Sequence, residues 1–181
     1  MPYLVALVVL VGVFCLVNLI LIVGVIRRLR EHDEALAARS EQEQNRRAIL
    51  SEGEVAEPFE TVSTDGGLVS RDRFEQPTLV GFFSPGCTAC HEALPGFLAM
   101  AERFPGGPEQ VLAVIVDENG ESGAQRASLE PVARVVVEKL GGPVTSALHV
   151  GAVPAFGLVG PGGTVMSSGL RLDQVLTAAS A

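Results

Sequence analysis

The chain has 181 residues, of which 48% are apolar and 19% charged, and its formal net charge is −8. Residues 1–26 contain no Asp, Glu, Lys or Arg, whereas the 131 residues from 51 to 181 carry 7 basic and 16 acidic side chains. So acidic a domain lacks the cations that would neutralise phosphates, which excludes nucleic acid as a partner. Three cysteines are too few for a scaffold that is held together by disulfides. A domain of this length can bury a hydrophobic core without disulfides.

The first part of the chain is a predicted membrane anchor. Residues 3–26 are uncharged and contain one amide, Asn18, and a spanning helix needs about 20 such residues. No Lys or Arg precedes the run, so it lacks the basic start of a cleaved signal peptide. We therefore expect residues 1–26 to be an uncleaved transmembrane anchor, in contact with lipid through residues 3–26. Cys15 lies inside this run as a small packing residue.

A charged connector follows the anchor. Residues 27–50 contain strong helix formers and no Pro or Gly, which predicts a solvated juxtamembrane helix. Residues 51–58 are acidic and end in Pro58, which predicts a linker into a globular domain at residues 59–181. Arg27, Arg28 and Arg30 come directly after the span, and the positive-inside rule taken alone would put this domain in the cytoplasm.

Residues 59–181 alternate strand-like and helix-like segments. TLVGFF and VLAVIV are continuous apolar runs, as in strands that are buried on both faces. The predicted strands are residues 59–62, 68–69, 78–83, 111–116, 155–159 and 164–166. Residues 132–137 fit either a strand or a helix, and their three consecutive valines favour a strand. The predicted helices are residues 87–104, 122–130 and 174–179. This order predicts a layered α/β domain.

Cys87-Thr88-Ala89-Cys90 stands between a predicted buried strand and a predicted helix. At a helix N-terminus, unpaired backbone N–H groups and the helix dipole stabilise a thiolate, which is the form that attacks disulfides. A two-residue spacer lets the two sulfurs reach each other within one turn. We expect Cys87 to attack and Cys90 to resolve the mixed disulfide that forms.

The segments FFSPGCTACHEALPGF and HVGAVPAFGLVGPGGTV make residues 59–181 resemble the thioredoxin-like superfamily. The resemblance implies a central mixed sheet flanked by helices. It also implies that Pro95 kinks the active-site helix and that Pro154, preceded by Val153, is a cis-proline that shapes a substrate groove facing the cysteines. Thr88, Ala89 and His91 become active-site neighbours.

The segment PFETVSTDGGLVS is similar to the opening hairpin of membrane-tethered thiol–disulfide reductases of the cytochrome c maturation and methylamine-utilisation accessory types. This resemblance implies exchange of disulfides with a protein substrate, an electron donor that the sequence does not name, and no cofactor. It also implies an extracytoplasmic domain, which we prefer over the orientation that the arginine cluster indicates.

Two positions depart from the family pattern. Gly86 stands where the family often has Trp, and Gly81 stands where it often has a buried Asp, Asn or Glu. Weak activity on generic disulfides is therefore expected. Thr88-Ala89 matches neither reducing nor oxidising members, so the direction of electron flow stays open.

The same residues permit other interpretations. Cys87 to His91 match the C-x-x-C-H pattern of haem attachment, and Ser84 precedes Cys87 by the spacing of a peroxidase. The two cysteines with His91 and His149 are a conceivable zinc set, although the usual paired spacing is missing. The main alternative is a thioredoxin-like binding module with weak redox activity.

Overall fold

The computed structural model describes Phe14 and residues 49–178. Apart from Phe14, the predicted anchor lies outside these residues, as does most of the predicted juxtamembrane helix. Within the part of the chain that is described, no helix is both long enough and apolar enough to cross a membrane.

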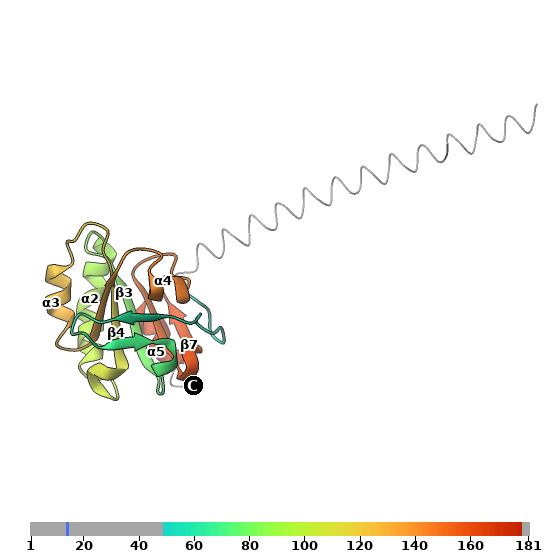
Figure 1. Cartoon of the computed structure of the whole chain (residues 1–181), viewed down its shortest axis with the longest axis horizontal. Coiled ribbons are helices and arrows are strands. Elements are labelled where there is room, and N and C mark those ends of the chain that lie inside the picture. The colour runs from blue at the N-terminus through green and yellow to red at the C-terminus, as the bar shows by residue number, and fades with distance from the viewer. Residues whose placement is uncertain (1–13, 15–48, 179–181) are drawn as a thin grey trace, which may run out of the picture. The chain divides into compact units, whose positions relative to one another are not determined.

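A five-stranded sheet with the strand order β5-β4-β3-β6-β7 lies at the centre of the domain (Figure 1). Its strands are β3 (Thr78–Phe83), β4 (Val111–Val116), β5 (Arg134–Glu138), β6 (Ala155–Val159) and β7 (Val165–Gly169). β3, β4 and β5 are parallel, whereas β6 is antiparallel to both β3 and β7, so the sheet is mixed. A separate hairpin pairs β1 (Glu60–Val62) with β2 (Leu68–Ser70).

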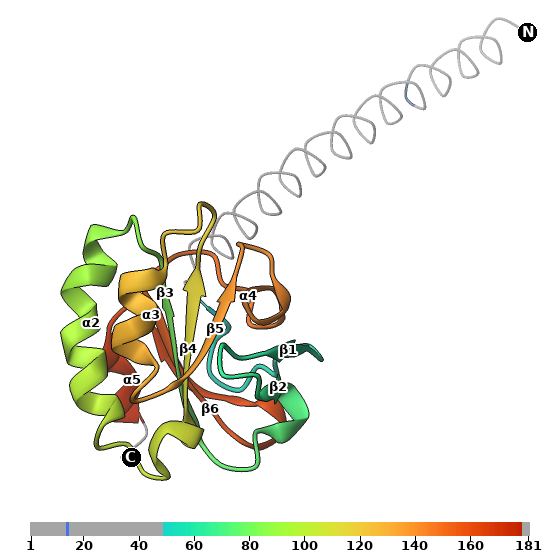
Figure 2. The same ribbon diagram turned by 60° about the vertical axis from the view of Figure 1, so that its left-hand side comes forward.

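Helices cover one face of the sheet, and a short helix with the hairpin covers the other (Figure 2). The first face carries α2 (Thr88–Ala101), α3 (Gly123–Leu129) and α5 (Leu172–Ala178), and the second carries α4 (Pro143–Ala147) with β1 and β2. Each face has its own buried apolar cluster. The sheet is thus the middle layer of three, as the sequence pattern predicts.

The two central parallel strands consist almost entirely of apolar residues because both of their faces are covered. Every residue of TLVGFF in β3 and of VLAVIV in β4 is buried. Their carboxyl ends lie at the same edge of the sheet, and α2 begins shortly after β3 ends. The sheet therefore places the start of α2, with its cysteines, at that edge.

The strands and helices predicted within residues 59–181 are confirmed with small shifts in their bounds, and the segment at residues 132–137, where valines favour strand, is β5. One helix, α4, was not predicted. It has five residues, and its N-terminal N–H groups at Val144 and Thr145 donate to the Glu138 carboxylate at 3.2 and 2.7 Å. The carboxylate comes from the end of β5, so a residue outside the helix supplies the cap that so short a helix needs.

The segment before β1 packs onto the domain. Ile49, Leu50 and Ala56 are 3%, 9% and 1% exposed and belong to the cluster on the α4 face. Gly53 N–H donates to Val165 O at 2.8 Å. Much of the range that we expected to be a linker, residues 51–58, thus has fixed contacts with β7 and the turn before it.

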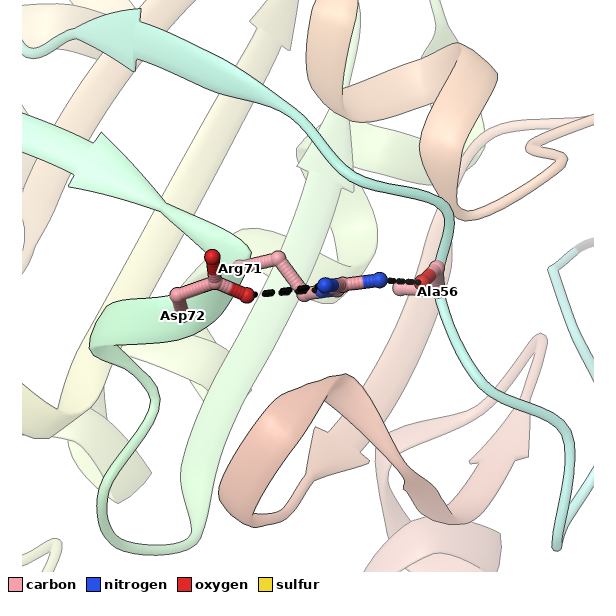
Figure 3. Close-up of polar contacts among 3 residues, drawn as sticks. All are labelled: Ala56, Arg71 and Asp72. Carbon is pink, nitrogen blue, oxygen red and sulfur yellow. Dashed lines mark hydrogen bonds and ion pairs between the residues drawn. The ribbon is translucent and has the colours of Figure 1, made fainter.

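The Arg71 side chain is hydrogen-bonded to this segment at Ala56 (Figure 3). Its Nη1 donates to Ala56 O at 3.5 Å, and its Nε donates to Asp72 Oδ1 at 3.0 Å. The Arg71 side chain lies against Gly163, where an added Cβ would come within 2.5 Å of Arg71 Cγ. Gly163 has φ +84°, so glycine suits both the conformation and the close approach.

We predict that Ile49→Ala lowers the free energy of unfolding by about 2–5 kcal/mol, because it leaves a cavity in a packed cluster. Pulse proteolysis of the full-length protein in urea measures this. Val55→Ala is the matched control, since Val55 lies in the same segment but is 54% exposed; it should change stability by less than about 0.5 kcal/mol. Equal effects would contradict the packing of Ile49.

Candidate redox site

Cys87 is the residue that caps the N-terminus of α2. Its backbone is extended, with φ −98° and ψ 111°, and its sulfur accepts a hydrogen bond from Cys90 N–H at 3.2 Å. The sulfur therefore takes the place that Ser or Asp oxygen takes in an ordinary cap.

The two cysteines are reduced and have different surroundings. Cys87 is half-buried, whereas Cys90 is fully buried. Burial, and next the hydrogen bond with Cys87, raises the pKa of the Cys90 thiol to about 12. At neutral pH Cys90 therefore stays protonated, while only Cys87 is open to a large partner.

The structure brings Val153 and Pro154 to the cysteine pair from 66 residues away in sequence. The Val153–Pro154 peptide bond is cis, as predicted. Cys87 Sγ lies 3.6 Å from Val153 O and donates to it. Both residues are half-buried and directly precede β6, so the backbone before this strand forms one wall of the site.

The other predicted neighbours surround the pair less closely. Thr88 and Ala89 are exposed in the first turn of α2, and Pro95 lies inside the helix. His91 is exposed, and its Nε2 donates to Pro85 O at 2.8 Å. His149 instead faces Glu57, with Nε2 and Oε1 3.3 Å apart, so the two histidines have separate partners.

The interior beneath the cysteines is aromatic. A Cβ added to Gly81 would lie 2.6 Å from Cε2 of Phe97 and 2.9 Å from Cε2 of Phe83. These rings pack edge to face with centroids 5.1 Å apart. The space of a side chain at position 81 is thus occupied by rings, which explains why glycine stands where an acid was expected from the family pattern.

We predict that Gly81→Ala lowers the free energy of unfolding by about 1–3 kcal/mol, because the added methyl group overpacks the rings. Gly86→Ala is the matched control: nothing lies within 4 Å of a Cβ at that position, and the change should stay below about 0.5 kcal/mol. Urea unfolding followed by circular dichroism compares the two. If Gly81→Ala leaves the free energy of unfolding unchanged, the rings can move to accept the methyl group and the predicted overpacking is wrong.

A pocket of about 560 Å³ adjoins Pro154. Its apolar lining includes Ala89 and Ala93 of α2 and Phe156 of β6. Glu92 and an Arg171–Asp173 ion pair of 2.9 Å supply charged lining. The pocket thus lies beside the cysteine pair, since Ala89 stands within the two-cysteine motif and Pro154 follows Val153.

Two polar residues near the site were missed by the sequence analysis. Asp117 follows β4, and its carboxylate accepts backbone N–H groups of residues 119–122 at 2.8–3.1 Å. Hydrogen bonds, that with Ser122 first, hold the pKa of Asp117 well below its usual range. Gln125 of α3 is 4% exposed, and its Nε2 donates to Ser84 O at 3.2 Å. The sequence offered little to single out Gln125, which is one polar residue within the short helix predicted at residues 122–130.

A scan against protein-family models found no match, and neither did a search of curated protein sequences. Solved structures do match. The thioredoxin domain of a thiol-disulfide oxidoreductase from Bacteroides vulgatus is 22% identical with a TM-score of 0.59, over 72% of this chain and 96% of that one. A thiol:disulfide interchange protein from Bacteroides sp. is 21% identical with a TM-score of 0.57, over 72% and 89%.

A thio-disulfide isomerase from Thermus thermophilus is 18% identical with a TM-score of 0.51, over 71% of this chain and 97% of that chain. Each neighbour is matched over nearly its whole length. The described domain of this chain therefore has the thioredoxin-like α/β fold that these thiol–disulfide oxidoreductases share.

Proposed function

We propose that the protein is a membrane-anchored thiol–disulfide oxidoreductase that exchanges disulfides with a protein substrate through Cys87 and Cys90. One observation carries this function: a half-buried cysteine caps α2, with the N–H of a buried second cysteine on its sulfur and the carbonyl before a cis-proline 3.6 Å away. The likeness in fold to thiol–disulfide oxidoreductases supports it.

The exchange has two steps. The Cys87 thiolate attacks a substrate disulfide, so a bond forms between Cys87 and one substrate sulfur while the other leaves as a thiolate. Cys90 then gives up its proton and attacks Cys87 Sγ, which releases the second substrate thiolate. Two electrons pass from the cysteine pair to the substrate; the reverse sequence oxidises two substrate thiols. The backbone at Val153 and Pro154 lines the groove in which the substrate segment lies.

Cycling is tested on the full-length protein in detergent micelles, with Cys15→Ala so that two thiols remain. The protein is equilibrated with graded ratios of reduced and oxidised glutathione, alkylated and analysed by mass spectrometry. The expected result is one two-electron transition that joins Cys87 to Cys90. The absence of any such transition would favour the binding-module alternative.

Substrate choice is restricted. Gly86 leaves open space before Cys87, and aromatic rings fill the position of a buried acid beneath it. Reduction of insulin, a generic protein disulfide, should therefore be slower than by an ordinary thioredoxin. Equal rates would contradict dependence on a dedicated partner.

The anchor defines the protein's place in the cell. The uncharged run at residues 3–26 supports contact with membrane lipid. The order of anchor, connector and opening hairpin β1–β2 supports a tethered reductase of the cytochrome c maturation or methylamine-utilisation accessory type. Such a protein acts on the extracytoplasmic side, where thiols are oxidised, and receives its electrons from a separate donor.

Sidedness is tested with fusions after Ala181. Alkaline phosphatase should be active there if the domain is extracytoplasmic. A silent phosphatase together with a fluorescent cytoplasmic fusion would reverse the orientation, as the arginines after the span would have it.

A further inference from the structure

Ser84 connects β3 to the cysteine turn, and its peptide groups contact both cysteines. Its carbonyl oxygen accepts the N–H of Cys87 at 3.2 Å. A hydrogen bond from the Ser84 backbone is the one influence that lowers the pKa of the buried Cys90 thiol, and among backbone groups only an N–H can donate it. The orientation of this residue's backbone therefore decides whether a donor faces the Cys90 sulfur.

Gln125 holds that backbone from the other side of the site. Its Nε2 is the second donor to Ser84 O, at 3.2 Å and across 41 residues of sequence. The orientation of the amide follows from chemistry, because an oxygen in that place would have no proton to donate to the Ser84 carbonyl. The side chain is 4% exposed, so this hydrogen bond lies away from water.

The other half of the amide is not satisfied. Among the described residues, no hydrogen-bond partner lies near the buried Oε1 of Gln125. A buried acceptor without a partner destabilises the folded state, whereas an apolar side chain of the same shape avoids that loss. A purely structural role would favour such an apolar residue here, so stability does not account for Gln125.

Aromatic packing removes the obvious alternative for assisting Cys90. The side-chain space at Gly81 is filled by Phe97 and Phe83, so no acidic group stands at that position. Ser84 N–H is the remaining polar contact that favours charge on the Cys90 sulfur, and Gln125 is the side chain that fixes Ser84.

We propose that Gln125 is a positioning residue for the exchange step at Cys90: by holding the Ser84 carbonyl it restrains the Ser84 backbone, so that the Ser84 N–H in the preceding peptide group stays directed at the Cys90 sulfur while that sulfur carries negative charge. This inference rests on the proposed function. In the reducing direction the charge arises when Cys90 loses its proton and attacks Cys87 Sγ, which expels the substrate thiolate. In the oxidising direction Cys90 leaves as a thiolate when a substrate thiolate attacks Cys87, so the same contact serves both directions.

The test separates the two steps with oxidised glutathione as the probe. Reduced full-length protein carrying Cys15→Ala is mixed with oxidised glutathione, quenched in acid and analysed by mass spectrometry. In Gln125→Met, attack by Cys87 should keep its rate, but the Cys87–glutathione adduct should be resolved roughly tenfold more slowly, as expected when a hydrogen bond to a charged group is weakened. The unfolding midpoint should be unchanged or higher.

Two further variants complete the design. Gln125→Leu is likewise apolar and has no donor for Ser84 O, so it should also accumulate the adduct. Arg126→Gln changes an exposed neighbour on the same helix and should behave as the parent does. Resolution at the parent rate in Gln125→Met, or lower stability with both steps slowed alike, would overturn the positioning role.

Failure of the proposed function has a different signature. In that case the parent protein itself would form no adduct at Cys87 and no Cys87–Cys90 disulfide, and the inference about Gln125 would fall with it. If the parent cycles and the Gln125 variants match it, only the inference falls.

Discussion

Cys90→Ser is expected to stop the exchange after its first step and to trap the protein as a mixed disulfide on Cys87. Cys87 is half-buried and lies beside Val153 O, so attack on a substrate remains possible without Cys90. The backbone N–H of the buried Cys90 already donates to Cys87 Sγ, so its thiol is the one that displaces the bound substrate, and without it the mixed disulfide persists. Turnover should fall on the order of 10³-fold or more, as when other covalent machinery is removed.

Cys87→Ser is the reciprocal variant. It should give the same loss of turnover but no mixed disulfide, because the remaining sulfur is fully buried. The species are separated by non-reducing electrophoresis of full-length protein after incubation with a disulfide-containing substrate. An adduct on Cys90 in the Cys87→Ser variant would reverse the assigned roles.

Alkylation of Cys90 is expected to be slow and to increase with pH far beyond the ordinary thiol range. Burial raises the pKa of Cys90 to about 12, whereas a free thiol has a pKa near 8.5. Since only the thiolate reacts, the reactive fraction at neutral pH is lower by roughly three orders of magnitude. Burial is the main cause, so the effect should persist in Cys87→Ser.

Iodoacetamide rates in the Cys87→Ser, Cys15→Ala protein test this between pH 7 and 11. The expected profile increases throughout, while the same chain in urea levels off near the pKa of an ordinary thiol. A plateau near pH 9 in the folded protein would contradict the raised value. The same shift makes the reduced protein less stable as pH rises from about 9 towards 12, because the unfolded chain loses this proton first.

Much of the fold could be predicted from the sequence because the strands and helices follow from patterns of neighbouring residues. The continuous apolar runs of β3 and β4 are what a strand covered on both faces requires, and both strands are found at their predicted bounds. The cysteine pair follows a strand and begins a helix, so its place at the carboxyl edge of the sheet was also predictable. Glycine-rich turns separated the strands of both hairpins.

The environment of each cysteine could not be predicted without the tertiary structure. The sequence shows two cysteines in one motif, but only the packing of α2 on the sheet buries Cys90 and leaves Cys87 half-open. Family resemblance predicted the cis bond at Pro154, and the sheet order β3-β6 then brings Val153 O to Cys87. Helix α4 escaped prediction because its cap comes from Glu138, outside the helix itself.

The sequence by itself determined the uncharged run at residues 3–26, the two-cysteine motif and the order of strands and helices, because each depends on residues that are close together in the chain. Only the tertiary structure decided that Ile49 and Leu50 belong to the domain core, that rings replace an acid beneath the cysteines, and that Gln125 reaches Ser84. Each of these features depends on contacts between separate elements of the fold. Their partners are set by how the layers pack, and the periodicity of a single segment carries no record of that packing.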